Sequence, residues 1–221
     1  MGKCLIVANL KSYQNENEAK SWLETFGKIK ELNLDLTQKE IIVCPSFTQL
    51  FSFFSYFSSN NIPVKLGAQD ISPFDEGPYT GEVNAKQVKD FAQYVLIGHS
   101  ERRQNFNETE DILMKKVTMA FKYGLNPIFL VQNQADSIPQ GVQVVAYEPT
   151  FAIGTGTTDT PENADAIAAV VKSKNNVQVL YGGSVTAENV RSFTAKTNLD
   201  GVIVGGASLE AEELLKIIQN A

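Results

Sequence analysis

The segment Val142-Gln143-Val144-Val145-Ala146-Tyr147-Glu148-Pro149 is followed by the glycine-punctuated stretch Thr150-Phe151-Ala152-Ile153-Gly154-Thr155-Gly156. Residues 142–147 form an apolar run that is typical of a strand buried on both faces, as in a parallel sheet. Pro149 lacks a backbone N–H, so the chain cannot continue past it as an interior strand. The sequence therefore predicts that Glu148 lies at the rim of a sheet, where a glycine-rich loop begins.

Apolar runs of the same kind recur along the chain. We interpret eight of them as strands, at residues 4–8, 40–44, 64–68, 94–98, 126–131, 142–147, 177–181 and 201–205. The intervals with the clearest helical periodicity or helix-forming composition are residues 16–31, 108–123, 161–174, 188–194 and 209–219. Buried strands that alternate with helices pair in parallel through right-handed crossovers, and eight such units predict an α/β fold, a closed (β/α)8 TIM barrel. An open doubly wound sheet is the alternative.

One crossover is too short for a normal helix. Only residues 133–141 separate the fifth predicted strand from the sixth, where a parallel crossover usually needs about a dozen residues. We therefore predict a vestigial fifth helix of at most about one turn. If Leu130 faces the barrel interior, strand alternation turns its two neighbours outward. The expected cover for Phe129 and Val131 is then Ile138 and Pro139, together with the flanking fourth and sixth helices.

Composition and charge limit the classes of partner. The net charge of −6 argues against broad binding to nucleic acid, which needs a basic surface. No apolar stretch reaches the roughly 18 residues that suggest a membrane span. The first apolar run passes directly into polar Asn9 and Lys11, so we expect a first strand rather than a signal peptide, and a cytoplasmic protein.

No linker-like stretch divides residues 1–221, which predicts a single domain.

The residues that usually bind metals are scarce. His99 is the only histidine, and the two cysteines, Cys4 and Cys44, are 40 positions apart in apolar runs. These positions favour buried free thiols over a disulfide or a zinc site. We expect no metal and no organic cofactor.

Polar side chains occur where three predicted strands end. The first strand is followed by Asn9-Leu10-Lys11, and alternation puts Asn9 and Lys11 on one side. The fourth is followed by His99, and the sixth by Glu148. Each residue alone is more often a solvated or hydrogen-bonded surface group. Because reactive groups of barrels gather at the carboxyl ends of the strands, their joint placement predicts an active site.

Paired glycines follow the seventh and eighth predicted strands. The runs are Tyr181-Gly182-Gly183-Ser184 and Val204-Gly205-Gly206-Ala207. Glycine lets backbone N–H groups approach a ligand closely, and a following helix N-terminus favours an anion. One such pair indicates no more than a tight turn, but two at adjacent strand ends indicate a phosphate site.

Together these residues closely resemble the triosephosphate isomerase family over essentially the whole chain. The motifs that carry the resemblance are Asn9-Leu10-Lys11, Gly67-Ala68-Gln69, Tyr79-Thr80-Gly81-Glu82, Gly98-His99-Ser100-Glu101-Arg102-Arg103, the segment that begins at Glu148, Tyr181-Gly182-Gly183-Ser184 and Gly205-Gly206-Ala207-Ser208-Leu209. The resemblance implies an isomerase of glycolysis and gluconeogenesis that interconverts dihydroxyacetone phosphate and D-glyceraldehyde 3-phosphate through an enediolate.

The resemblance also implies roles for individual residues. Glu148 would be the base, His99 a neutral electrophile, and Lys11 the positive charge beside the enediolate. Asn9 would position Lys11, and Glu101 would support the same network. The lid would comprise residues 149–158. The groups that hold the phosphate and the closed lid would come from Gly154, Tyr181, Ser184, Gly205 and Gly206.

A homodimer is implied as well, since residues 75–82 match the family's intersubunit loop and Thr80 would reach Asn9 of the neighbouring subunit. The chain departs from the family pattern at three places. Leu10 and Phe151 stand where tryptophan is usual, and Leu130-Val131-Gln132-Asn133 replaces a Cys-Val-Gly-Glu run. These departures leave the lid motion and the packing behind Glu148 open.

Two other functions are compatible with a phosphate-binding barrel. The first is another phosphosugar enzyme such as an epimerase, although the metal-dependent ones need ligands that this chain lacks. The second is a binding protein without activity. The presence of Asn9, Lys11, His99 and Glu148 together disfavours the second.

Overall fold

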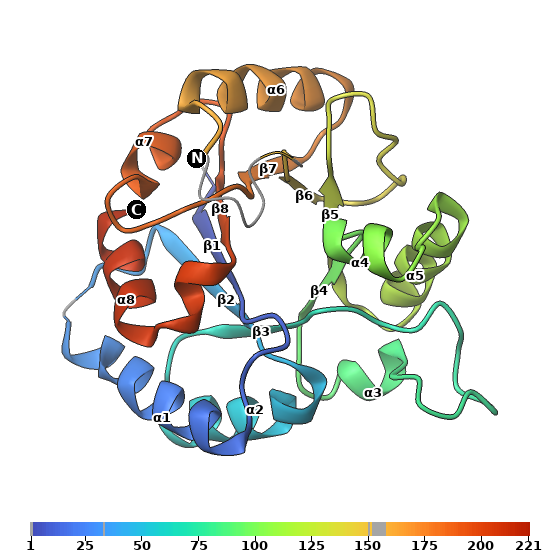
Figure 1. Cartoon of the computed structure of the whole chain (residues 1–221), viewed down its shortest axis with the longest axis horizontal. Helices are drawn as coiled ribbons and strands as arrows, with labels where there is room; N and C mark the ends of the chain where they lie inside the picture. Colours follow the sequence, from blue (N-terminus) through green and yellow to red (C-terminus); the bar gives the residue numbers. More distant parts are fainter. Residues whose placement is uncertain (1, 33, 150, 152–157) are drawn as a thin grey trace.

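A computed structural model describes residues 2–32, 34–149, 151 and 158–221. Eight parallel strands pair in chain order, and β8 closes on β1 to complete a barrel (Figure 1). The strands are β1 (Cys4–Asn9), β2 (Lys39–Cys44), β3 (Lys65–Ala68), β4 (Tyr94–Ile97), β5 (Asn126–Val131), β6 (Val144–Tyr147), β7 (Gln178–Tyr181) and β8 (Gly201–Val204). The predicted (β/α)8 barrel is confirmed, and the open sheet is wrong.

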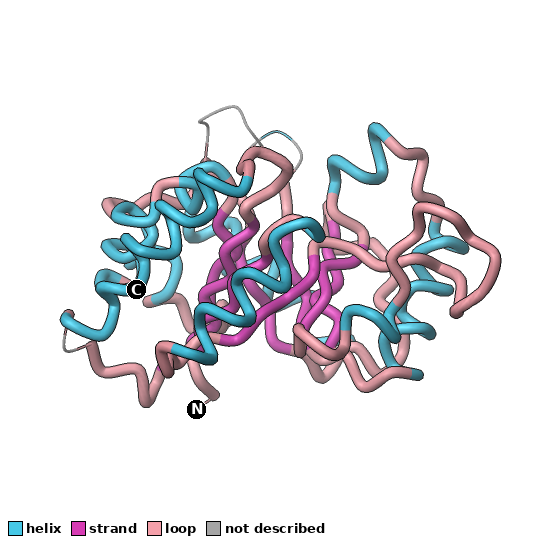
Figure 2. The backbone as a smooth tube through the Cα atoms, turned by 90° about the horizontal axis from the view of Figure 1, so that it is seen from below, coloured by secondary structure: helices cyan, strands magenta, loops and turns pink. Residues whose placement is uncertain are grey.

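Helices surround the strands, which occupy the centre of the molecule (Figure 2). The α-helices are α1 (Glu16–Phe26), α2 (Leu50–Ser59), α3 (Ala85–Val88), α4 (Ser100–Asn105), α5 (Glu110–Lys122), α6 (Pro161–Lys174), α7 (Val190–Thr194) and α8 (Ala211–Asn220). The longer ones begin at caps, such as Asn15 before α1 and Thr160 before α6, whose side chains accept free backbone N–H groups. None of the described helices is long and apolar enough to span a membrane.

Strand alternation divides the core into two layers. One cluster fills the barrel interior, and it includes Leu5, Val7, Leu130 and Ala146. A larger cluster lies between the strands and the helices, and Phe129 and Val131 belong to it. Leu130 therefore faces inward, and its two neighbours face outward, as predicted.

The crossover from β5 to β6 is short, as expected. Residues 132–143, all of which the structure describes, form turns and contain no helix, so the ring of helices is interrupted there (Figure 1). Phe129 is nevertheless fully buried, and Val131 is almost so. Ile138 packs against the same cluster, as predicted, and Pro139 is buried, whereas its contact with Phe129 and Val131 stays a prediction. Of the two flanking helices, α5 packs against β5, whereas α6 packs mainly against β7.

Several helices differ from the predicted ones. The first predicted helix covers residues 16–31. Its α-helical part ends at Phe26, and Gly27–Glu31 form a 3-10 helix. The predicted segment at residues 209–219 begins instead with a 3-10 turn at Gly206–Leu209, followed by α8. The sequence gives no bounds for helices α2, α3 and α4, although the predicted barrel requires helices between its strands. The sequence of α2, Leu-Phe-Ser-Phe-Phe-Ser-Tyr-Phe-Ser-Ser, consists mostly of weak helix formers, and tertiary packing of its buried face stabilises it.

Candidate active site

The carboxylate of Glu148 lies buried just beyond the end of β6, with 4% of the residue exposed. One oxygen, Oε2, accepts a hydrogen bond from the backbone N–H of Ser100 at 3.2 Å. The other, Oε1, lies 3.2 Å from Nε2 of His99. Both oxygens therefore contact groups at the start of α4, two strands away around the barrel.

His99 is held in one orientation by the helix that it caps. Its Nδ1 accepts the backbone N–H of Glu101 at 3.2 Å, at the start of α4. A nitrogen that accepts a hydrogen bond carries no proton, so the hydrogen of the neutral ring lies on Nε2. The imidazole can therefore donate from Nε2 toward the pocket, where Glu148 Oε1 accepts.

Burial sets the acidity of Glu148. Removal of the carboxylate from water raises its pKa above the ordinary value, against the smaller lowering effects of His99, Ser100 and Lys11. A carboxylate whose charged form is disfavoured in this way takes up a proton more readily than a solvated one. This property suits a general base, whose pKa is best placed closer to the working pH.

Lys11 brings a positive charge to the same pocket from the end of β1. Its Nζ lies 2.7 Å from Glu101 Oε1, and its backbone N–H donates to Asn9 Oδ1 at 3.1 Å. Its φ of 52° lies in the left-handed region, which is uncommon for a residue with a side chain. The two residues that alternation placed together, Asn9 and Lys11, do line one cavity.

The glycine-rich ends of β7 and β8 also line this cavity, which has a volume of about 380 Å³. A side chain at Gly182 would meet Glu148 Cγ at 2.9 Å, and one at Gly183 would meet the hydroxyl of Tyr181 at 2.0 Å. Only glycine fits at these two positions. Beyond β8, Ser208 Oγ donates to the carbonyl oxygens of Asn9 and Gly205, which ties that loop to β1.

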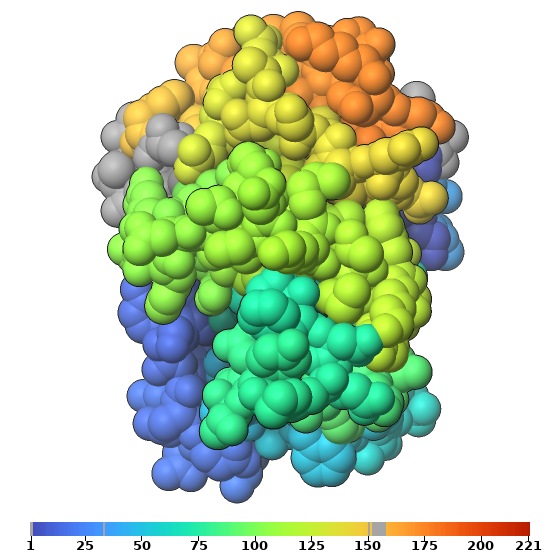
Figure 3. Space-filling model, turned by 90° about the vertical axis from the view of Figure 1, so that its right-hand side faces the viewer, coloured from blue at the N-terminus to red at the C-terminus, as the bar shows by residue number. Residues whose placement is uncertain are grey.

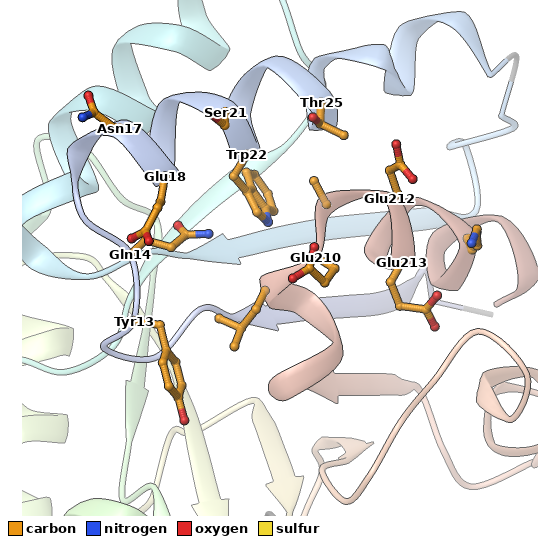
Figure 4. A pocket seen from close by; sticks show the side chains of 13 residues that line it. Tyr13, Gln14, Asn17, Glu18, Ser21, Trp22, Thr25, Glu210, Glu212 and Glu213 are labelled. Atoms are coloured by element: carbon orange, nitrogen blue, oxygen red, sulfur yellow. The ribbon is translucent and has the colours of Figure 1, made fainter.

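A larger hollow of about 820 Å³ lies between α1 and α8 (Figure 4). Four carboxylates and a single lysine contribute to its lining: Glu18, Glu210, Glu212, Glu213 and Lys216. An excess of negative charge repels phosphate, so this hollow does not suit a phosphorylated ligand. The smaller cavity, which contains Lys11 and the paired glycines, is the candidate active site.

Most of the predicted site residues meet in this cavity. Its lining includes Asn9, Lys11, His99, Glu148, Ser184, Gly205 and Gly206. Glu101 lines an adjoining hollow, where it pairs with Lys11. Gly154 and most of the predicted lid, residues 150 and 152–157, lie outside the described residues. Tyr181 accepts the backbone N–H of Asp159 at 2.9 Å, just beyond that segment.

Sequence reasoning missed several residues that support the site. Ser100 acts through its backbone N–H, which leaves no signal in the identity of the residue. Gln69 and Asp70 follow β3 at the same face of the barrel, so the rule that found Glu148 could have drawn attention to them. Asp70 is paired with Lys116 from α5, which is 2% exposed, and such a distant partner has no local sequence signal.

Both cysteines are free; Cys44 is buried as predicted, whereas Cys4 is half-buried. Within the described part of the chain, no group of three or more histidine, cysteine, aspartate or glutamate side chains could hold a metal ion. The candidate cavity brings together a carboxylate, an imidazole and an ammonium group.

The fold and the site define a class of protein: a (β/α)8 barrel whose strands end at a cavity lined by a carboxylate, an imidazole, an ammonium group and paired glycines. The sequence model described as triosephosphate isomerase matches residues 4–221. The triosephosphate isomerase of Dictyoglomus turgidum is 36% identical over 100% of both chains, and that of Alkaliphilus oremlandii is 37% identical over 99% of each. The crystal structure of triosephosphate isomerase from Bartonella henselae superimposes with a TM-score of 0.83 at 26% identity and covers 97% of each chain. This chain belongs to the triosephosphate isomerase family.

The burial of Glu148 predicts a stability change of defined sign. The pKa of Glu148 in the folded state lies above 4.5, the ordinary value that we take for the unfolded state. As the pH rises from 4.5, the folded state therefore keeps this proton longer than the unfolded state does, and the free energy of unfolding falls. Glutamine cannot ionise. We expect Glu148→Gln to raise the Tm relative to the unmodified protein at pH 7, and this gain to shrink as the pH falls toward about 4.5, below which the carboxyl group is protonated in both the folded and the unfolded state.

Calorimetry between pH 4 and 8 measures this difference. Glu162→Gln is the matched control, because the pKa of that exposed carboxylate is lowered by its hydrogen bond to Lys196 and no gain is expected. A Tm difference for Glu148→Gln that is independent of pH, or that grows on acidification, would contradict the account.

Proposed function

We propose that this chain is an active triosephosphate isomerase, which moves a proton between the two carbons of a triose phosphate through an enediolate. Family membership supports the reaction. The observation that carries the proposal is the buried carboxylate of Glu148 in contact with Nε2 of His99, beside the ammonium group of Lys11. These three groups are a base, a hydrogen-bond donor and a positive charge in one cavity.

Glu148 is the proposed base. In the structure its carboxylate is held by Ser100 N–H and His99, so a substrate that enters the cavity must compete for one of these contacts. Desolvation raises the pKa of the carboxylate and strengthens it as a base. Since the reaction needs a proton removed from one carbon and returned to the next, a single carboxylate that reaches both is sufficient.

His99 and Lys11 are proposed to stabilise the enediolate. The Nε2–H of the neutral imidazole donates toward the substrate oxygens, and the ammonium group lies where negative charge develops. Asn9 accepts the backbone N–H of Lys11, and Glu101 accepts its ammonium group, so both are positioning residues.

The phosphate group is proposed to bind where β7 and β8 end. Ser184, Gly205 and Gly206 line the cavity there, and a Cβ at Gly206 would meet nothing within 4 Å, which leaves room for a ligand close to the backbone. Gly154 is proposed to add its N–H from the lid.

We also propose that residues 1–221 work as a single barrel domain in the cytoplasm.

Two alternatives have less support. A metal-dependent epimerase needs a set of ligands that the described residues do not provide. A binding barrel without activity does not need a carboxylate kept out of water beside an imidazole, an arrangement that reduces stability at neutral pH.

An isomerase assay tests the proposal. We expect the unmodified protein to interconvert the two triose phosphates, and Glu148→Gln to lower kcat by about 10²–10⁴-fold, the usual contribution of a general base. Glu212→Gln, which removes an exposed carboxylate from the larger acidic hollow, is the matched control and should leave kcat unchanged. Near-normal turnover of Glu148→Gln, or a loss in Glu212→Gln, would show that the wrong cavity was assigned.

We further propose a homodimer formed through the loop of residues 75–82. This loop projects from the barrel (Figure 1) and forms a raised surface below the green segment that contains α4 and α5 (Figure 3). Phe74, the residue before the loop, stacks against Tyr79 with ring centroids 4.5 Å apart, although both side chains are more than 40% exposed. Asp75 pairs with Lys122 and accepts a hydrogen bond from Tyr123, which fixes the base of the loop to α5.

Exposed stacked aromatic rings on a fixed loop are typical of an interface. We expect the unmodified protein to be a dimer by light scattering, and Tyr79→Asp to shift it toward monomers with a lower kcat/KM, because Thr80 no longer reaches Asn9 of the neighbour. Phe121→Asp, at an aromatic residue of the same 42% exposure, is the control and should remain dimeric. A fully active monomer at assay concentration would refute the proposal.

A further inference from the structure

The side chain of Gln69 joins the ends of two strands. It follows β3, and its Nε2 donates to the carbonyl oxygen of Lys11 at 2.8 Å and to that of Cys44 at 2.9 Å. Both neighbours are acceptors, so the amide nitrogen must face them. Gln69 therefore clamps the peptide that follows Lys11 to the end of β2.

This clamp acts on a backbone that has an unfavourable conformation. Lys11 has a φ of 52°, and a residue with a side chain occupies that region at a cost that the surroundings must offset. Its N–H is held by Asn9 Oδ1, and its carbonyl is held by Gln69. The direction in which the lysine side chain leaves the backbone depends on both contacts.

The clamp is part of a closed ring of contacts around Lys11. The ammonium group of Lys11 pairs with Glu101, and the next residue, Arg102, pairs with Asp70 at 2.9 Å. Asp70 in turn is the residue after Gln69. Lys116, 2% exposed, contacts both oxygens of Asp70 at 2.5 and 2.7 Å and so fixes this segment to α5. Lys11 is thus held at its carbonyl oxygen by Gln69 and at its ammonium group by Glu101, and the pair Asp70–Arg102 links the segments that carry these two residues.

There is also little room for the lysine stem to shift. A Cβ placed on Gly205 would lie 3.2 Å from Lys11 Cε, so the stem runs close against the end of β8. A small rotation of the Lys11 peptide would therefore change where its ammonium group lies in the cavity.

We propose that Gln69 is a positioning residue for Lys11, which holds the lysine backbone in its left-handed conformation and thereby aims the ammonium group at the substrate. The inference rests on the proposed function of Lys11. Gln69 touches no reacting atom; it acts only through the carbonyl of Lys11.

Gln69→Glu is the sharpest variant, since it keeps the size of the side chain but replaces the N–H donors with oxygens that repel the two carbonyls. Gln69→Met removes the donors without adding charge. We expect each variant to lower kcat/KM by about 10- to 100-fold, the effect of a misplacement of about 1 Å in an active site. Because Lys11 also attracts the anionic substrate, KM should rise as kcat falls. A mere loss of folded enzyme would lower kcat and leave KM unchanged.

The matched control is Gln93→Glu. Gln93 also contacts β3, but its Oε1 accepts the N–H of Leu66 at 3.3 Å, and a carboxylate keeps that acceptor. We expect its kcat and KM to remain normal. The crystal structure of Gln69→Met, or of Gln69→Glu if that variant folds better, should show Lys11 with a changed φ and a longer Nζ–Glu101 distance.

The outcomes separate the two proposals. If the unmodified protein does not isomerise triose phosphates, the proposed function fails. If it does, but both Gln69 variants stay within twofold of its kcat and KM, or change only the Tm, the positioning role is overturned. Loss of activity with Lys11 unmoved in the crystal structure would overturn it as well.

Discussion

The carboxylate of Glu148 is almost completely removed from water, and its two oxygens are satisfied by His99 and by the first N–H of α4. This contact requires that the end of β6 lie close to the end of β4, and the parallel pairing of both strands with β5 brings their carboxyl ends to the same rim of the barrel. The interior cluster that includes Leu130 and Ala146 fills the space below. The chemistry of the site therefore depends on the same packing that closes the barrel.

Positive and negative charges are distributed differently in the two hollows at this end of the barrel. The chain has a net charge of −6, and the charged side chains that line its larger hollow are four glutamates and one lysine. The candidate active site is lined instead by Lys11 and by the paired glycines at the ends of β7 and β8. Such an arrangement favours a small anion at one place and repels polyanions elsewhere. Glu101 and Asn9 hold Lys11 from its two ends, so its charge is available in a defined position.

The eight strands and the residues at their carboxyl ends could be predicted from the sequence because both signals are local. Apolar runs identify buried strands, and Asn9, His99 and Glu148 directly follow three of them. Even the short crossover was predictable, since a count of residues 133–141 excludes a full helix.

The parts that could not be predicted depend on contacts between distant segments. Helix α2 consists mainly of phenylalanine and serine, which carry little helical signal without the barrel against which the helix packs. The contact of Ser100 with Glu148 uses a backbone N–H, so no particular side chain indicates it. Lys116 resembles any helical surface lysine in the sequence, yet it is buried against Asp70 from another crossover.

The central claim is that a neutral His99, with its proton on Nε2, faces the carboxylate of Glu148. Because His99 is the only histidine, nitrogen-15 NMR of the histidine-labelled protein reports its protonation directly. At neutral pH the account predicts a neutral ring in which Nε2 carries the hydrogen and Nδ1, which accepts the N–H of Glu101, carries none. A doubly protonated ring, or a neutral ring with its hydrogen on Nδ1, would contradict it.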